Sequence, residues 1–288
     1  MTAGPPPGEW APPTDVDGIH AATGTGHDLV LRREGPVAVL TLNRAEKRNA
    51  LTGEMSWGLA RVLRALSEDP SVRACVITGA PPAFCAGGDV GTFPVSGGAQ
   101  APPYRPARAE IYPPVAIRDA PFPVIAAVNG VAAGAGFALA LACDLAIADP
   151  GARFGALQVR RGLVADWGLT WLLVRAVGRG RALELLWSGD WVDAPGARAL
   201  GLVNRVSASG TTLDEALCWA AELAAGPSAA MTLMKRAAHR AVEMSLEEAL
   251  ETDSLMQARA FGTADAAEGA RAFMEKRSPQ FNQEKGDT

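Results

Sequence analysis

The sequence has few of the residues that most often carry metal or nucleophilic chemistry. It contains three histidines, two of them before residue 28, and four cysteines. No cysteines form a CxxC pair or show zinc-type spacing with histidine, so we expect neither a metal site nor histidine catalysis. Each cysteine lies in an apolar stretch, which favours a buried, reduced thiol and therefore a reducing cytoplasm. The four are Cys75, Cys85, Cys143 and Cys218.

Long apolar runs and clusters of positive charge are also missing. No run approaches the ~20 apolar residues that a membrane-spanning helix needs. The N-terminal residues lack the basic and apolar regions of a signal peptide. The 27 Lys and Arg residues are outnumbered by 31 Asp and Glu residues, and no basic run marks a face for nucleic acid. We therefore expect neither a membrane nor a nucleic acid as a partner.

The composition is otherwise that of a globular protein, with 48% hydrophobic and 20% charged residues in a chain of 288. Residues 1–27 are rich in Pro, Gly, Ala and Thr without periodicity, which predicts a disordered leader. Residues 28–226 alternate strand and helix patterns, and residues 227–288 are helical almost throughout. This order predicts an α/β core followed by an α-helical domain. The Gly- and Pro-rich stretch 91–114 is long for a loop, and such loops are commonly functional.

Apolar runs and small-residue stretches predict the main elements of the core. Residues 72–78, 124–128 and 145–148 have the short, continuous apolar pattern of buried strands. Residues 134–143 predict a helix of small side chains, and residues 167–177 predict a further helix.

Two glycine-rich segments follow predicted strands and could form a binding site for negative charge. They are Phe84–Val90, after the strand at 72–78, and Asn129–Gly136, after the strand at 124–128. Turns of such small residues leave backbone N–H groups unpaired and let a ligand approach closely, and a helix N-terminus adds its dipole. Side by side, the two turns would offer two donors to one oxygen atom. On spacing alone, ordinary tight turns are the favoured interpretation.

Five motifs together resemble the crotonase (enoyl-CoA hydratase/isomerase) superfamily in order and approximate distance. The resemblance covers about residues 28 to 282. It implies a spiral of ββα units and a C-terminal α-helical trimerisation domain, in trimers that often pair into hexamers. It also implies an acyl-CoA thioester as the substrate, with coenzyme A as part of that substrate and no further cofactor. The motifs are Leu42–Leu51, Phe84–Val90, Val124–Asp144, Gly201–Val203 and Glu275–Phe281.

The resemblance assigns roles to individual residues. The oxyanion hole falls on the backbone N–H groups of Gly88 and Ala135, where Ala135 replaces the middle glycine of the family's usual GGG run. Lys47 and Arg48 are the expected phosphate partners, although a solvated charged turn explains them equally well. Lys276 and Phe281 are expected near the adenine, in the same chain or in a neighbouring subunit. The full set of expected substrate contacts is Ala45, Lys47, Arg48, Ala86, Gly87, Asp89, Gly134, Gln158, Trp167, Lys276 and Phe281.

The acid pattern departs from that of the family's hydratases, which use two glutamates. The matching positions here hold Ala138 and Gln158, and neither side chain can carry a proton. Asp166 resembles the aspartate of the dienoyl-CoA isomerases and of the ring-opening isomerases of phenylacetate catabolism. The dienoyl enzymes carry further carboxylates at the two positions, so the single-aspartate isomerases are the closer model. Asp166 could instead cap the helix predicted from Trp167.

These patterns favour an isomerase of unsaturated or cyclic acyl-CoA, with Asp166 as the proton shuttle. One alternative is a hydratase of unusual acid pattern, in which Gln158 holds the water. Others are an acyl-CoA hydrolase and an acyl-CoA binder without turnover.

Overall fold

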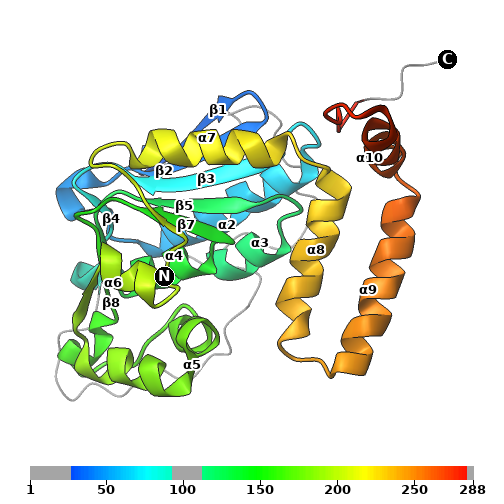
Figure 1. The fold of residues 1–288 in the computed structure, drawn as a ribbon. Coiled ribbons are helices and arrows are strands. Elements are labelled where there is room, and N and C mark those ends of the chain that lie inside the picture. The colour runs from blue at the N-terminus through cyan, green and yellow to red at the C-terminus, as the bar shows by residue number, and fades with distance from the viewer. Residues whose placement is uncertain (1–26, 93–111, 284–288) are drawn as a thin grey trace, which may run out of the picture.

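The computed structural model describes residues 27–92 and 112–283. The predicted leader, apart from His27, and most of the stretch 91–114 therefore lie outside the described residues. The chain forms a layered α/β body and a C-terminal helical arm that stands beside it (Figure 1). In the described residues, no helix is long and apolar enough to cross a membrane.

A six-stranded sheet in the order β1-β2-β3-β5-β7-β10 forms the centre of the body. Its first two strands are an antiparallel hairpin, and the others run parallel. Every residue of β3 and β5 is buried, as expected for parallel strands covered on both faces. The predicted strands at 124–128 and 145–148 are confirmed as β5 and β7. The strands are β1 (Leu29–Glu34), β2 (Val37–Leu42), β3 (Ala74–Gly79), β5 (Val124–Val128), β7 (Leu145–Ala148) and β10 (Arg205–Val206).

A second sheet of short strands, in the order β4-β6-β8-β9, was not predicted from the sequence. We expected each glycine-rich segment to turn directly from a long strand. Instead, each segment first forms a short strand. Three residues are too few to show the alternation that marks a strand. The repeated order of long strand, short strand and helix gives the spiral of ββα units. The short strands are β4 (Ala83–Cys85), β6 (Val131–Ala133), β8 (Arg153–Gly155) and β9 (Trp191–Asp193).

Helices cover both faces of the main sheet. The amphipathic helix α7 packs its buried alanines on one face, and α2 and α4 cover the other (Figure 1). The helix predicted at 134–143 is α4, and the one predicted from residue 167 begins at Leu169 and bends at Gly178. The helices of the body are α2 (Gly53–Glu68), α3 (Pro113–Asp119), α4 (Ala135–Ala142), α5 (Leu169–Ser188), α6 (Ala194–Ala199) and α7 (Thr212–Ala224), with 3-10 turns η1 (Ala45–Lys47), η2 (Val90–Thr92) and η4 (Leu157–Arg161).

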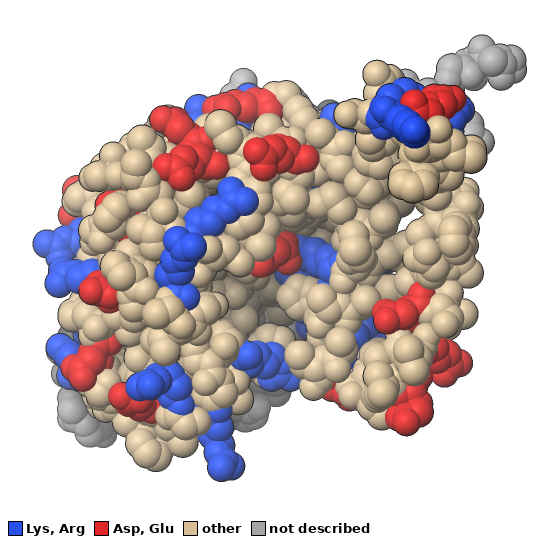
Figure 2. Space-filling model, viewed as in Figure 1, with Lys and Arg blue, Asp and Glu red and all other residues tan. Residues whose placement is uncertain are grey.

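The arm consists of α8 (Ser228–Ala241), α9 (Leu246–Phe261) and α10 (Ala264–Glu275). No residue of α8 or α9 is buried. Figure 2 shows the hollow between the body and the arm, a cavity of about 680 Å³ walled by α3, α5, α8 and α9. Polar contacts fasten α8 to the body. Lys235 Nζ donates to the carbonyl oxygens of Ile117 and Phe122 and pairs with Asp144 at 2.7 Å, and Thr232 Oγ1 donates to the Pro121 carbonyl oxygen.

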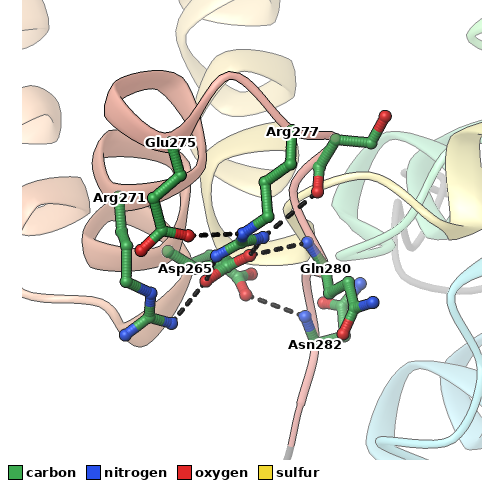
Figure 3. A network of polar contacts seen from close by, with 8 residues as sticks. Asp265, Arg271, Glu275, Arg277, Gln280 and Asn282 are labelled. Carbon is green, nitrogen blue, oxygen red and sulfur yellow. Dashed lines mark hydrogen bonds and ion pairs between the residues drawn. The ribbon is translucent and has the colours of Figure 1, made fainter.

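The C-terminal segment folds back along α10 through a polar network (Figure 3). The Glu268 carboxylate accepts hydrogen bonds from Arg277 Nη1 at 2.6 Å and from the Gln280 backbone N–H at 2.9 Å. The Asn282 N–H donates to Asp265 at 2.8 Å, and the Asn282 side chain donates to the carbonyl oxygen of Gly226 at 2.7 Å. The last described residues thus return to the start of the arm.

Candidate active site

Backbone hydrogen bonds from the segment that precedes α2 hold the first glycine-rich turn in place. Leu51 N–H donates to the Gly87 carbonyl at 2.8 Å, and Asp89 N–H donates to the Leu51 carbonyl at 2.9 Å. In this parallel bridge between Leu51 and Gly88, the neighbours of Gly88 make the hydrogen bonds. The Gly88 N–H therefore points away from Leu51.

The second turn leads from β6 into α4. Its entry is fixed by Gly134, whose N–H donates to the Gly155 carbonyl at 2.9 Å. Gly134 has φ 54° and ψ −118°, a conformation that a residue with a side chain adopts only under strain. Ala135 is the first residue of α4, so its N–H has no partner within the helix and lies at the positive end of the helix dipole.

Close backbone contact brings the two turns together. Gly87 has φ 101°, and a Cβ atom there would lie 2.9 Å from the Ala133 carbonyl oxygen and 3.7 Å from the Ala135 nitrogen. Gly136 also lets the two turns approach each other, because a Cβ atom there would lie only 2.3 Å from the Cys85 carbonyl oxygen. Among the described residues, no backbone hydrogen bond is made by the N–H of Gly88 or of Ala135. The two turns thus lie against each other, and each carries one of these N–H groups.

A buried asparagine and a half-buried arginine, which the sequence did not single out, hold the first turn. Asn49 is fully buried with φ 57°, accepts from the Arg44 N–H, and donates to the carbonyl oxygens of Ala80 and Ala83 at 2.7 Å each. Arg44 Nη1 donates to the Ala50 carbonyl at 2.7 Å and to Asp89 Oδ2 at 3.2 Å. Asparagine adopts a left-handed backbone more readily than most residues. The asparagine at position 49 was therefore the available signal in the sequence.

Asp89, an expected substrate contact, is turned toward the protein. The Gly91 N–H and the Arg44 guanidinium both donate to its carboxylate, and these hydrogen bonds lower the pKa of Asp89. The side chain thus ends the turn and pairs with Arg44.

The Asp166 side chain does not cap a helix. Helix α5 begins at Leu169, its N-cap is Gly168, and no side chain caps it. Only the backbone oxygen of Asp166 takes part there, accepting from the Leu169 N–H at 2.9 Å. The capping interpretation is therefore wrong, because Trp167 with φ 55° and Gly168 with φ 76° keep the chain out of the helix for two more residues.

The Asp166 carboxylate instead contacts Gln158, which lies over the second turn. Gln158 Nε2 donates to Asp166 Oδ1 at 3.0 Å. A Cβ atom on Gly134 would lie 3.4 Å from that same Nε2 atom. The amide therefore joins the carboxylate to the residue that precedes the Ala135 donor. Among the described residues, the buried Gln158 Oε1 atom has no hydrogen-bond partner, an arrangement that typically costs about 1–3 kcal/mol.

Two other positions are closed to acid or nucleophilic chemistry. Ala138, at the first glutamate position, is fully buried inside α4. Cys85 lies at the start of the first turn, but burial raises the pKa of its thiol to about 12, so it stays protonated.

Cys218 is exposed, contrary to our expectation, because it lies on the outer side of α7. No group of side chains suited to a metal ion occurs in residues 27–92 and 112–283.

An apolar cavity of about 190 Å³ lies beside Trp167, between α3, α5 and α8. Trp167 meets the Tyr112 ring edge to face at a centroid distance of 6.4 Å. Trp167, the residue that follows Asp166, thus borders a mainly hydrophobic space. Other residues that line it are Pro114, Val115, Arg118, Ala142, Gly168, Trp171, Leu172 and His239.

The expected coenzyme A contacts fall into two groups. Ala45, Lys47 and Arg48 run beside the first turn, because the Arg48 carbonyl accepts from the Ala86 N–H at 2.9 Å, and both basic side chains are exposed. Lys276 caps the C-terminus of α10 and Phe281 lies in the segment after it, and α10 stands well away from β4 (Figure 1). Within one chain they do not approach the turns, so a contact from a neighbouring subunit stays a prediction.

Comparisons with known proteins agree with this architecture. Residues 32–284 match the family model described as enoyl-CoA hydratase/isomerase. The chain is 40% identical to the 1,2-epoxyphenylacetyl-CoA isomerase of Escherichia coli over 86% of this chain and 95% of that one. It is 35% identical to the 2,3-dehydroadipyl-CoA hydratase of the same organism, over 88% and 98% of the two chains.

A solved enoyl-CoA hydratase from Mycobacterium smegmatis superimposes with a TM-score of 0.80 at 35% identity, covering 89% of this chain and 99% of that one. The fold, the family model and these relatives agree over the same residues. The chain belongs to the enoyl-CoA hydratase/isomerase family.

Proposed function

We propose that the protein isomerises unsaturated acyl-CoA thioesters, with Asp166 as the proton shuttle. The observation that carries this proposal is the direction of the Asp166 side chain. It takes no part in capping α5, and through Gln158 it is joined to the turn that carries Ala135. The described residues offer one carboxylate in this place and an alanine at the first position where the family's hydratases hold glutamate.

The proposed reaction moves one proton between two carbons of the acyl group. The thioester oxygen accepts hydrogen bonds from the N–H groups of Gly88 and Ala135. Asp166 takes a proton from the α-carbon, and the electron pair of the broken C–H bond passes to the thioester oxygen to give a dienolate. Asp166 returns the proton to the γ-carbon, and the double bond ends in conjugation with the thioester. Each oxyanion donor typically contributes ~10²–10³ in rate and a general base ~10²–10⁴, and no further cofactor is needed.

The surroundings of Trp167 favour an acyl group with a ring or another bulky apolar part. The cavity beside it is walled mainly by hydrophobic side chains, including two tryptophans. The isomerase relative, named for an epoxyphenylacetyl substrate, supports the same substrate class.

The direct test is the conversion of a 3-enoyl-CoA into the conjugated 2-enoyl-CoA, followed by ultraviolet absorbance. Asp166→Asn should lower kcat by about 10²–10⁴-fold, because the amide cannot take the proton. The matched control is Asp190→Asn, at an exposed aspartate that pairs with Arg160 at 3.0 Å. An unchanged rate in Asp166→Asn would remove this residue from the mechanism.

Water addition is the second candidate, and the unpartnered Gln158 Oε1 atom favours it. A buried acceptor beside a carboxylate suits a bound water molecule. Substantial 3-hydroxyacyl product from crotonyl-CoA would support a hydratase. Release of free thiol would identify a hydrolase, and tight acyl-CoA binding without turnover would identify a binder.

We also propose that the protein is a homotrimer or a pair of trimers in the cytoplasm. The arm supports an assembly, because it exposes large apolar side chains that a single chain leaves uncovered. An exposed free thiol at Cys218 and three buried ones suit a reducing compartment. The uncovered side chains are Met234, Val242, Leu246, Leu250, Leu255, Phe261, Phe273 and Met274.

A further inference from the structure

Gln158 occupies an unusual place between the two halves of the site. It belongs to the short turn η4, and its amide nitrogen lies both near Gly134 and 3.0 Å from Asp166 Oδ1. A side chain at Gly134 would be strained at its φ of 54°, and the Gln158 amide lies in van der Waals range of the position that its Cβ atom would take. The amide is therefore held against the backbone that carries the Ala135 donor.

The Asp166 carboxylate has little else to fix its direction. It is exposed, it lies in the loop between η4 and α5, and its side chain makes no capping bond. An aspartate in such a place can rotate freely about its side-chain bonds. A donor on Oδ1 fixes one oxygen and leaves Oδ2 as the atom that can meet a proton of the substrate.

The direction of the Gln158 amide points to the same role. Nε2 faces the carboxylate, and the buried Oε1 atom has no partner among the described residues. Turning the amide over would bring its oxygen against the carboxylate, which is unfavourable. The unpaired acceptor lowers the stability of the fold, while the amide nitrogen donates to the carboxylate. Such a cost in stability is typical of residues that are kept for function.

We propose that Gln158 is a positioning residue, which orients the Asp166 carboxylate toward the acyl group bound at the Gly88 and Ala135 donors. This role rests on the proposed proton transfer by Asp166. Gln158 transfers no proton itself. It acts through one donated hydrogen bond, so its contribution should appear in the chemical step rather than in substrate binding.

Two substitutions separate the hydrogen bond from the shape of the side chain. Gln158→Met keeps the length and removes the donor, and Gln158→Glu keeps the shape but cannot donate once ionised. Both should lower kcat on the order of 10- to 100-fold with little change in KM, as for other residues that orient a reacting group. Gln158→Met should also keep or raise the thermal midpoint, because it removes the unpaired acceptor. If Gln158→Glu kept full activity, the role would be space filling and the proposal would be overturned.

A double-mutant cycle tests whether Gln158 acts through Asp166. The four proteins are the wild type, Gln158→Met, Asp166→Asn and the double variant, each assayed with the same 3-enoyl-CoA. Exchange of the α-protons of a saturated acyl-CoA into deuterium oxide, followed by NMR, measures residual enolate formation. We expect Gln158→Met to have no further effect once Asp166 has been replaced.

The outcomes distinguish this proposal from the proposed function. If Asp166→Asn is inactive and Gln158→Met equals the wild type, Gln158 has no positioning role and the proposed function stands. If Gln158→Met lowers the rate equally in both backgrounds, Gln158 contacts the substrate independently and the proposal is overturned. If Asp166→Asn keeps full activity, the proposed function fails first and the positioning role fails with it.

Discussion

The body and the arm of this protein are stabilised in different ways. In the body, whole strands such as β3 and β5 are buried, and glycines let backbones meet almost without side chains between them. In the arm, α8 and α9 bury no residue, and ion pairs and hydrogen bonds along α10 hold the chain in place. The body therefore completes its own core, and the arm leaves an apolar surface that a partner subunit would cover.

This difference bears on the site, because every turn that forms it belongs to the body. The proposed donors are backbone groups held by close packing, so small additions of volume should disturb them strongly. The same additions in the arm should be tolerated. Matched substitutions in the two regions can therefore test the comparison.

The largest effect is expected from adding one methyl group where α4 meets β4. In Gly136→Ala, the new Cβ atom would lie 2.3 Å from the Cys85 carbonyl oxygen and 2.6 Å from the Cys85 Cβ atom. Neither neighbour can move without shifting the strand, so we expect a loss of about 3 kcal/mol or more in unfolding free energy, and loss of activity. Denaturant unfolding and the isomerase assay measure both effects.

The control is the same substitution in the arm. Gly269 lies inside α10, and a Cβ atom there would meet Phe281 Cε1 at an ordinary 3.6 Å. Gly269→Ala should therefore stabilise the helix by up to about 1 kcal/mol. Equal effects at the two glycines would contradict the contrast between body and arm.

A large effect on assembly is expected from a charge on the arm. Leu250 of α9 is 58% exposed in the single chain. Leu250→Asp should shift the protein toward a single chain of 29.9 kDa, because a buried, unpaired charge disfavours an interface. Light scattering coupled to size-exclusion chromatography measures the mass. Glu251→Gln, at the exposed neighbouring position, should leave the mass unchanged, and a wild-type protein of single-chain mass would refute the proposed trimer.

An intermediate effect on the unfolding free energy is expected when alanine replaces either of two asparagines with similar left-handed backbone angles. Asn49 has φ 57° and Asn282 has φ 58°, so replacement by alanine adds similar backbone strain at both. Asn49 is fully buried and bonds three backbone groups, the Arg44 N–H and the carbonyl oxygens of Ala80 and Ala83. We expect Asn49→Ala to lower the unfolding free energy by about 3 kcal/mol and Asn282→Ala by about 1 kcal/mol. Urea unfolding measures both, and a larger loss at Asn282 would contradict the comparison.

The sequence predicted the features that rest on local patterns and motifs. Continuous apolar runs marked β5 and β7, and the two glycine-rich segments marked turns that the fold brings together. The resemblance supplied the ββα spiral, whereas its assignment of the oxyanion donors to Gly88 and Ala135 stays a prediction. These features depend on backbone conformation, which glycine and apolar residues reveal directly in a sequence.

The features that were missed depend on long-range contacts. The short strands of the second sheet carry too few residues for a periodic pattern. Two of the three hydrogen bonds of Asn49 join segments more than 30 residues apart. The contact between Gln158 and Asp166 could not be foreseen, because capping by Asp166 was equally consistent with the sequence and only the left-handed backbone of Trp167 excludes it.

The smallest effect is expected from the pH dependence of the arm. The Arg277 guanidinium, and after it the Gln280 N–H and Arg271, hold the pKa of Glu268 well below its usual value. Because the folded-state pKa lies below the unfolded value of about 4.3, the ionised carboxylate stabilises the arm above that pH. This stabilisation is lost as the pH falls further, toward the folded-state pKa.

Glu268→Gln should therefore lower the thermal midpoint modestly at pH 7, and the difference from the wild type should shrink as the pH falls below about 4. Differential scanning fluorimetry between pH 3 and pH 7, a range set by the unfolded value of about 4.3, measures this difference. Glu222→Gln, at an exposed glutamate of α7, is the matched control in the body and should show a smaller difference. A difference at Glu268 that stays constant over this range would mean that its charge does not hold the C-terminal segment against α10.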